Sequence, residues 1–375
     1  MNNSLSLAVP TLLGTESIVA NEIRSFGWET TEVTDGRVTF RGDFDTLCRA
    51  NINLRSAGRV MIKIAEFKAL SFEELFEEIK KINWEDYIVK DGAFPVNGYS
   101  LKSALHSVPN CQSIIKKAIV TRLSQVYKIN WFEESGAVYP IRFSIMKDVV
   151  SVFIDTTGDN LCKRGYRQKS VDASLRETIA SGMIFLSRWQ GDRMFADPFC
   201  GSGTIAIEAA MYAMKIAPGL KRNFAAEKWQ NLISKDIWNN AKSEAEEAID
   251  YSIKPEIYAS DISDEAIRIA KINAKSAGVA DKLHFSVCDV NDLAPSDEKG
   301  VIICNPPYGE RLMNESKVKS LYRDMGRKFS EFKNAKKYIL TSFDEFEKYY
   351  GKKADKKRKI YNGMIKCDIY QYYKI

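Results

Sequence analysis

The sequence has few of the side chains that build metal centres or disulfide frameworks. It contains two histidines, His106 and His284, and seven cysteines, an odd number in which no two form a Cys-x-x-Cys pair. Zinc sites and disulfide scaffolds need such residues at short, repeated spacings. We therefore expect no metal ion and no disulfide, and we interpret both histidines as structural. Cys200 and Cys304 are interpreted as small apolar residues in a reducing compartment.

Long apolar runs are also lacking. No run approaches the roughly 20 residues that a membrane-spanning helix needs. The N-terminal residues Met1-Asn2-Asn3-Ser4 lack the basic start of a secretion signal. The sequence thus predicts a cytoplasmic protein without a membrane association.

The residues that are present have the composition of a globular protein, 45% hydrophobic and 28% charged, and a length of 375 residues suits two or three domains. Residues 1–157 carry 18 Lys and Arg against 19 Asp and Glu, whereas residues 158–375 carry 37 against 30. Much of the positive excess comes from two runs, 163–169 and 352–359. Such runs suit a phosphate backbone, and a solvated charged loop is the alternative.

The most informative stretch is 197–204, Asp-Pro-Phe-Cys-Gly-Ser-Gly-Thr, between an apolar run and a helical pattern. Two glycines spaced by one residue let the backbone turn sharply and approach a ligand closely. The loop amides and the start of the following helix then face whatever binds at the end of the strand. There is no Gly-Lys-Ser/Thr ending, so a nucleotide-binding P-loop is not indicated.

A second motif, 305–309, Asn-Pro-Pro-Tyr-Gly, directly follows the apolar run 301–304. With the glycine loop, it resembles the class I S-adenosylmethionine-dependent methyltransferases that modify exocyclic amines of nucleobases. Residues 310–312, Glu-Arg-Leu, and the stretch 217–229 are similar to bacterial RNA guanine-N2-methyltransferases with an N-terminal THUMP domain. The resemblance covers essentially the whole chain and is strongest from about Arg164 onward.

The N-terminal half reads as two α+β modules. Strands at 5–9, 31–33, 38–40 and 60–64 and helices at 15–26 and 43–53 give a βαββαβ pattern, which predicts a ferredoxin-like domain over 1–66. Helices at 72–82 and 111–127 and strands at 96–105, 141–145 and 149–154 follow. The resemblance identifies 67–157 as the THUMP RNA-binding domain.

The C-terminal part, 158–375, alternates strands and helices, as a doubly wound parallel sheet does. A helix at 173–180 leads into it. The predicted strands are 194–196, 256–260, 283–288, 301–304 and 337–342. A hairpin turn at Asn362-Gly363 adds an antiparallel end, the methyltransferase variant of a Rossmann-like α/β fold. The helical surplus 228–251 is predicted to be an insertion beside the active site.

The resemblance implies a site for S-adenosyl-L-methionine. Asp197 would accept the cofactor ammonium, Asp261 the ribose hydroxyls, and Asp289 the adenine amino group. A helix cap is the alternative role of each aspartate, and Ser263 is a candidate cap that would leave Asp261 free. The complete predicted cofactor set is Asp197, Pro198, Phe199, Cys200, Gly201, Gly203, Thr204, Asp261, Ile262, Asp289, Val290 and Asn305.

The predicted catalytic residues are Asn305, Pro306, Pro307 and Tyr308. An exocyclic amine is a poor nucleophile because its lone pair is delocalised into the ring. The Asn305 side-chain oxygen and the Pro306 carbonyl can accept its hydrogens and favour a pyramidal nitrogen. Tyr308 offers a face on which a flipped base can stack.

The RNA-binding residues are predicted in two places, the basic run after the THUMP domain and the basic helix within it. They are Arg164, Tyr166, Arg167, Lys169, Lys116 and Lys117. The function that the resemblance implies is formation of N2-methylguanosine in large-subunit rRNA. A tRNA guanine-N2-methyltransferase, a DNA adenine-N6-methyltransferase and a non-catalytic RNA-binding assembly factor are the alternatives. The sequence does not distinguish a monomer from a homodimer.

Overall fold

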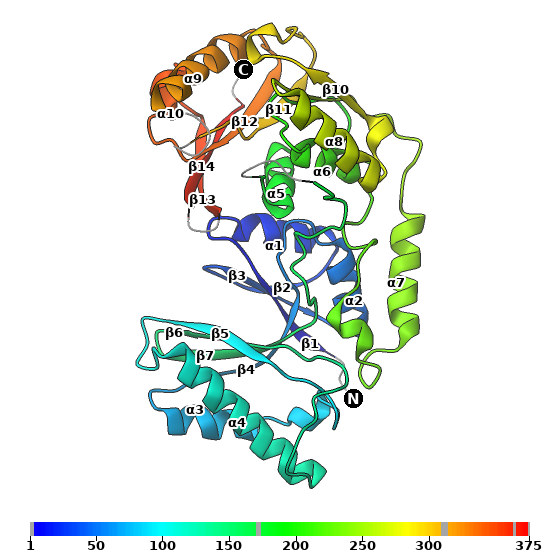
Figure 1. Ribbon diagram of the computed structural model, residues 1–375, viewed down its shortest axis with the longest axis vertical. Helices are drawn as coiled ribbons and strands as arrows, with labels where there is room; N and C mark the ends of the chain where they lie inside the picture. The colour runs from blue at the N-terminus through cyan, green and yellow to red at the C-terminus, as the bar shows by residue number, and fades with distance from the viewer. Residues whose placement is uncertain (1–3, 170–173, 309–313, 363–364, 374–375) are drawn as a thin grey trace.

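The computed structural model describes residues 4–169, 174–308, 314–362 and 365–373. Its strands form two seven-stranded sheets, one in the N-terminal half and one in the C-terminal half (Figure 1). The helices α1 and α5 lie between the two sheets and contact each other. None of the helices within the described ranges is long and apolar enough to cross a membrane.

The first half of the N-terminal sheet has the predicted ferredoxin-like order. Its elements are β1 (Leu5–Pro10), α1 (Glu16–Ser25), β2 (Thr30–Thr34), β3 (Arg37–Gly42), α2 (Phe44–Asn53) and β4 (Met61–Lys68). The strands run β2-β3-β1-β4, with β1 antiparallel to both of its neighbours. The side chain of Asp43 caps α2 by accepting from the backbone N–H of Thr46.

The second half continues the same sheet. Its elements are α3 (Phe72–Lys81), η1 (Trp84–Asp86), β5 (Val96–Leu101), α4 (Val108–Tyr127), β6 (Ile141–Met146) and β7 (Val149–Asp155). Strand β4 pairs with β1 at its start and with β7 along its length, so it crosses the predicted boundary after residue 66. Ser71 caps α3 as predicted, whereas α4 begins earlier than expected because Pro109 fits its first turn.

The C-terminal sheet has the order β10-β9-β8-β11-β12-β14-β13. The first five of these strands are parallel, and β14 is antiparallel to β12 and β13. The predicted α/β sheet with an antiparallel terminal hairpin is therefore confirmed. The strands are β8 (Met194–Asp197), β9 (Ile257–Asp261), β10 (Leu283–Val287), β11 (Gly300–Cys304), β12 (Ala335–Thr341), β13 (Lys356–Asn362) and β14 (Ile365–Tyr372).

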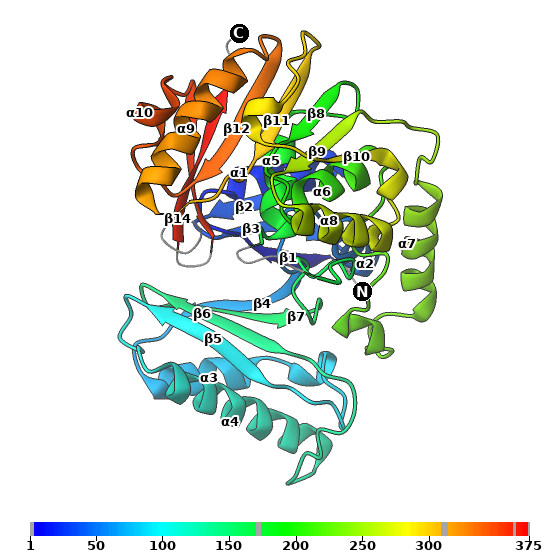
Figure 2. The same ribbon diagram turned by 45° about the horizontal axis from the view of Figure 1, so that its top comes forward.

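Helices cover both faces of this sheet (Figure 2). One apolar core joins the sheet to α5, α6 and α8, and a second joins its other face to α9 and α10. The longer helices are α5 (Glu177–Ser187), α6 (Thr204–Ala213), α7 (Lys235–Glu247), α8 (Asp264–Ala277), α9 (Glu315–Ser330) and α10 (Phe346–Tyr350). Short turns are η2 (Ala225–Lys228), η3 (Ala280–Lys282) and η4 (Val290–Asp292).

Two predictions about this half are wrong. The insertion that contains α7 does not lie beside the strand ends of the site but packs against α2 of the N-terminal sheet. Its Trp229 stacks on Tyr139 at 4.9 Å, and both rings belong to the N-terminal core. The helix expected at 173–180 begins at Glu177, and residues 170–173 lie outside the described residues.

Candidate cofactor and substrate site

Four neighbouring strands each end in a predicted polar residue. Strands β10, β9, β8 and β11 lie side by side and run parallel. They lead to Asp289, Asp261, Asp197 and Asn305, in that order across the sheet. Because the carboxyl ends of parallel strands meet at one edge, the fold gathers these side chains at the place where α/β sheets bind ligands.

The glycine loop between β8 and α6 has the tight conformation that its sequence predicts. Gly201 and Gly203 have φ values of 51° and 84°, a region that favours glycine. A Cβ at Gly203 would lie 3.0 Å from the Cβ of Ala270, so glycine also permits α8 to approach. The backbone N–H of Cys200 donates to the carbonyl of Ser260 at 2.9 Å, which fixes the loop on β9.

Asp261 holds this loop directly. Its Oδ2 accepts from the backbone N–H of Gly201 at 2.9 Å, and its Oδ1 accepts from that of Ser263 at 3.0 Å. Ser263 caps α8 as predicted, accepting from the N–H of Ala266. The expectation that Asp261 would then be free is wrong, because both carboxylate oxygens already have backbone donors. The neighbouring Ile262 is 69% exposed and presents an apolar surface beside the carboxylate.

One oxygen of Asp289, Oδ1, and the side chain of Val290 are engaged within the protein. The side chain of Asp289 accepts from the backbone N–H and the side-chain amide of Asn291, both at 2.9 Å. It therefore serves as the cap of η4, the alternative that the sequence left open. Val290 is buried in the core beneath α9.

Asp197 is the most unusual group at the site. It is 1% exposed, its Oδ1 accepts from the backbone N–H of Phe199 at 3.3 Å, and its Oδ2 has no partner among the described residues. Burial raises the pKa of the Asp197 carboxyl well above its usual range, and the negative charge of Asp261 adds to this. A buried carboxylate oxygen without a donor suits a cationic ligand group such as an ammonium.

The other predicted cofactor residues of the glycine loop are mostly buried. Pro198 and Cys200 are buried, and burial raises the pKa of the Cys200 thiol. Phe199 is half-buried and packs against the core on the α9 side. Thr204 is buried, and its hydroxyl accepts from Arg167 at 2.9 Å instead of facing the ligand side.

The Asn-Pro-Pro-Tyr segment follows β11, the strand beside β8. The Asn305 Oδ1 is buried and has no partner among the described residues. Pro306 is buried, and the carbonyl of Pro307 accepts from the Tyr322 hydroxyl at 3.4 Å. The half-buried Tyr308 has its hydroxyl 3.9 Å from the Cys367 sulfur, and burial raises its pKa. Gly309 and the 310–312 motif lie outside the described residues.

Tyr322 supports this segment, and the sequence did not indicate it. Its hydroxyl also contacts that of Thr341 at 2.8 Å, which links α9 to the end of β12. Tyr322 is fully buried, and its hydroxyl supports the Asn-Pro-Pro-Tyr segment from the protein core.

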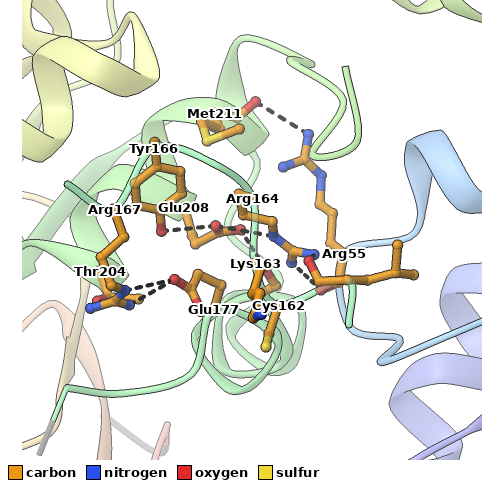
Figure 3. A network of polar contacts seen from close by, with 12 residues as sticks. Arg55, Cys162, Lys163, Arg164, Tyr166, Arg167, Glu177, Thr204, Glu208 and Met211 are labelled. Carbon is orange, nitrogen blue, oxygen red and sulfur yellow. Dashed lines mark hydrogen bonds and ion pairs between the residues drawn. The ribbon is translucent and has the colours of Figure 1, made fainter. Parts of the chain in front are cut away.

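Three predicted residues of the basic run after the THUMP module are buried or partly buried, contrary to expectation, whereas Lys163 and Lys169 are exposed. Arg164 and Tyr166 are both 3% exposed and converge on Glu208 of α6 (Figure 3). The Arg164 guanidinium pairs with Glu208 at 3.5 Å and donates to the backbone carbonyls of Leu161 and Arg55. The Tyr166 hydroxyl donates to Glu208 at 3.1 Å. Neither side chain is available to an RNA phosphate.

Arg167 is partly buried and clamps the cofactor loop (Figure 3). Its guanidinium donates to the Ser202 and Thr204 hydroxyls at 3.0 and 2.9 Å. It also pairs with Glu177 of α5 at 2.8 Å, and burial raises the pKa of that carboxyl. Its side chain thus joins the linker and α5 to the glycine loop. Lys169 is exposed, so it alone of the four predicted residues in this run has the expected placement.

The two THUMP lysines lie on α4, on the face of the sheet that points away from the catalytic half (Figure 2). Lys116 is paired with Glu134 and lies over the ring of Phe94 at 3.5 Å. Lys117 is exposed. The structure therefore does not bring these lysines together with the linker run.

No group of histidine, cysteine or acidic side chains within the described ranges could hold a metal ion. His284 stacks on Tyr258 at 5.1 Å, and the His106 ring contacts the carbonyl of Ala104 at 3.0 Å. The histidines thus take part in local packing and local hydrogen bonds.

Family models match each part of the chain. An "RlmL ferredoxin-like domain" model matches residues 6–61, and a THUMP domain model matches residues 69–155. A model described as "RMKL-like, methyltransferase domain" matches residues 164–371, more than half of the chain. The glycine loop, the Asn-Pro-Pro-Tyr segment and the antiparallel hairpin define a methyltransferase. More narrowly, the chain belongs to the RMKL-like methyltransferase family, with a ferredoxin-like and a THUMP domain before the catalytic domain.

Individual relatives agree with this assignment. One relative is a Bacillus subtilis protein named "Putative RNA methyltransferase YpsC", to which the chain is 48% identical. The match covers 96% of this chain and 94% of the relative. The chain is 34% identical over 98% of its length to ribosomal RNA large subunit methyltransferase K/L of Psychromonas ingrahamii, of which it spans 50%. The solved structure described as "Crystal structure of SMU.472, a putative methyltransferase complexed with SAH" matches 100% of this chain and 99% of its own, with a TM-score of 0.94 and 40% identity.

Proposed function

We propose that this chain transfers a methyl group from S-adenosyl-L-methionine to the exocyclic N2 amine of a guanine in RNA, with large-subunit rRNA as the substrate. The observation that carries the proposal is a pair of buried acceptors at the ends of neighbouring strands, Asp197 Oδ2 and Asn305 Oδ1, neither of which has a partner among the described residues. One suits a cation and the other suits an amine hydrogen. Methyl transfer to an exocyclic amine needs both beside each other.

The residues at the ends of β8 and β9 fit the cofactor. Asp197 can accept its ammonium, the glycine loop leaves room for its backbone, and Ile262 offers an exposed apolar face to the adenine ring. Asp261 keeps the loop in position and can add a ribose contact, because a carboxylate oxygen accepts more than one hydrogen bond. When bound, S-adenosylmethionine supplies an electrophilic methyl group on a positively charged sulfur.

Asn305 supplies the substrate side of the chemistry. Its Oδ1 accepts one hydrogen of the amine, which favours a pyramidal nitrogen with its lone pair directed away from the ring. With the cofactor bound, the nitrogen held by Asn305 would form its bond to the methyl carbon as the sulfur–carbon bond breaks, and the electron pair of that bond would stay on the sulfur. The amine then loses a proton to water. The hydrogen bond to this preorganised acceptor becomes stronger as positive charge develops on the nitrogen. It therefore stabilises the transition state more than the bound substrate, which accelerates the reaction.

RNA is the proposed substrate class because of the THUMP domain and the names of the relatives. Exposed cations on both domains are consistent with a phosphate backbone, among them Lys117, Lys169 and Lys359. The curated K/L relatives act on large-subunit rRNA by name, and this chain spans about half their length. The cysteines are free in the described structure, which fits a cytoplasmic reaction.

The experiment that tests the proposal is a product analysis. The full chain and its Asn305→Ala variant are incubated with methyl-labelled S-adenosylmethionine and a large-subunit rRNA transcript, a tRNA pool or duplex DNA. Nucleosides from each digest are then separated by mass spectrometry. We expect labelled N2-methylguanosine from rRNA, and almost none with Asn305→Ala.

Each other result has a defined meaning. If only tRNA is labelled, the substrate assignment changes from rRNA to tRNA. If the product is N6-methyladenine, the target base changes from guanine to adenine, and the methyltransferase assignment stands. If no nucleic acid is labelled although SAH binds, a non-catalytic role in RNA binding or assembly becomes the better account.

A further inference from the structure

A cavity of about 550 Å³ lies between the N-terminal domain and the catalytic sheet, away from the cofactor site. Its walls come from α1, the C-terminal end of α5, and strands β12, β13 and β14. Lys336, at the start of β12, lines it, whereas the cofactor loops follow the opposite ends of the parallel strands. The two sites therefore lie at opposite edges of the same sheet.

Strand pairing places the polar wall of this cavity on one face. Gln371 of β14 is directly opposite Tyr338 of β12 and Lys356 of β13. Residues opposite one another on neighbouring strands share a face, and so do residues two positions apart on one strand. Lys336 and Arg358 are therefore on the same face as these three, and all five line the cavity.

The wall is strongly positive. Arg188, Lys336, Lys356 and Arg358 line the cavity, and no carboxylate among the described residues lines it. None of the four takes part in an ion pair found among the described residues. The carboxylate of Asp355 is nearby but accepts from the backbone N–H of Tyr373 at 2.7 Å and does not line the cavity. Clustered cations without a counter-charge raise the local potential and attract anions.

Two donors at this wall also lack acceptors. Gln371 is 4% exposed, and its side-chain nitrogen has no partner among the described residues. The Nε of Arg358 is likewise buried and finds no partner in the described part of the chain, although its Nη1 donates to Gly14 and Ser17 of the N-terminal domain at 2.9 Å. Buried donors are nearly always satisfied, so an acceptor-rich ligand fits here.

We propose that this cavity binds the phosphate of a nucleotide, held by Arg188, Lys336, Lys356 and Arg358. Its volume lies in the usual range for small-molecule sites, and Phe185 and Tyr373 give it aromatic surface for the attached nucleoside. The nucleotide is either free or a unit of an RNA strand that passes this edge. The RNA source rests on the proposed function, whereas the phosphate site does not.

The matched pair for the test is Lys356 and Lys357 on β13. They are adjacent, exposed and equal in charge, but Lys357 lies on the opposite face, over the ring of Tyr370 at 5.5 Å. The pocket variant is Arg188→Gln with Lys356→Gln, and the control is Lys353→Gln with Lys357→Gln. Both remove two charges from the full chain. The affinity for SAH, measured by calorimetry, verifies that each variant keeps its fold and cofactor site.

The probes are inorganic phosphate, guanosine 5′-monophosphate and a single-stranded RNA oligonucleotide. If the source is a free nucleotide, the pocket variant binds guanosine 5′-monophosphate about tenfold or more weakly than the parent, and the control does not. If the source is RNA, the slope of log affinity against log salt falls by about one to two units in the pocket variant only.

The proposal is overturned if the parent, the pocket variant and the control bind all three probes alike. Absence of methylation by the parent, with its phosphate binding intact, would instead count against the proposed function. Loss of phosphate binding with methylation intact would leave the proposed function standing. The two proposals can therefore fail separately.

Discussion

The Asp261 carboxylate and the Gly201 backbone amide are joined by a hydrogen bond of 2.9 Å, which ties the end of β9 to the loop after β8. Asp261 therefore acts on the cofactor in two ways, by direct contact and by holding the loop. We expect Asp261→Ala to weaken SAH binding by at least about 1.5–3 kcal/mol, the usual worth of a hydrogen bond to a charged group. Titration calorimetry on the full chain measures this directly.

The matched control for Asp261 is Asp264→Ala in the exposed first turn of α8. It removes the same charge three residues away without touching the loop. Equal SAH affinity in the Asp261 and Asp264 variants would show that Asp261 neither contacts the cofactor nor holds the loop for it.

A second prediction concerns pH and Asp197. Burial raises the pKa of this carboxyl in the free protein, whereas an ammonium at Oδ2 would favour the ionised form. Binding below that raised pKa must therefore release a proton, and SAH affinity should rise with pH until the carboxyl is already ionised. Calorimetry in buffers of different ionisation enthalpy counts the protons. Asp197→Asn should abolish the release, and an unchanged proton count in that variant would contradict the assignment.

The raised pKa of Asp197 makes folding stability fall as the pH rises, whereas SAH affinity should rise with pH. Because the folded-state pKa of Asp197 is raised, its contribution to stability is fully present below the ordinary aspartate pKa. That contribution is lost as the pH rises through the raised value. Glu22 and Glu177 are shifted in the same direction by burial, so stability alone does not isolate Asp197. Proton release on binding is the measurement that does.

A third prediction follows from the buried pair Arg164–Glu208, whose side chains are 1% and 0% exposed. Replacing Arg164 with methionine leaves the Glu208 charge buried without its cation. Removal of one partner of a buried ion pair typically costs about 3–5 kcal/mol. We expect that loss in the free energy of unfolding of Arg164→Met, measured by urea denaturation.

Lys163→Met is the control for Arg164, because Lys163 is exposed and its ion pair is with the exposed Asp159. It should change the free energy of unfolding by less than about 1 kcal/mol. A lower RNA affinity in Arg164→Met with unchanged stability would restore the RNA role that the structure argues against.

Much of the site could be predicted because it depends on local pattern. Short apolar runs followed by Asp197, Asp261 or Asn305 place polar groups at strand ends, and a parallel sheet brings those ends together. The doubly wound parallel character of the catalytic sheet, though not the order of its strands, followed from the alternation of strands and helices. The double role of Asp261 was not predictable, because its hydrogen bond to Gly201 joins residues from different strands.

The error over Arg164 has a physical reason. A run of basic residues indicates charge but not its partner, and the partner lies 44 positions away. Glu208 was the available signal, since an acid within the otherwise apolar stretch 205–210 must be paired when that helix is buried. The packing of α7 on α2 was hidden for a similar reason, because it joins apolar faces of two helices distant in sequence.

The last prediction isolates the chemical step. Asn305→Ala removes the buried Oδ1 acceptor but leaves the glycine loop, Asp197 and Asp261 in place. The lost interaction is stronger in the transition state than in the bound substrate, so kcat should fall by roughly 10²-fold or more. The SAH affinity should stay within about twofold, since no cofactor contact of a charged group is lost.

Tyr308 provides the contrast, because its ring rather than a reacting contact is the proposed feature. Tyr308→Phe keeps the ring and loses the hydroxyl, which contacts the Cys367 sulfur at 3.9 Å and the side chain of Asn362, so its kcat/KM should stay near that of the parent. Tyr308→Ala should raise KM more than it lowers kcat, by the roughly 1–3 kcal/mol of a base–aromatic stack. Steady-state kinetics on one RNA substrate compares all three variants.

Full activity in Asn305→Ala would refute the proposed mechanism, whereas a kcat loss confined to Tyr308→Ala would assign the chemical step to that ring instead.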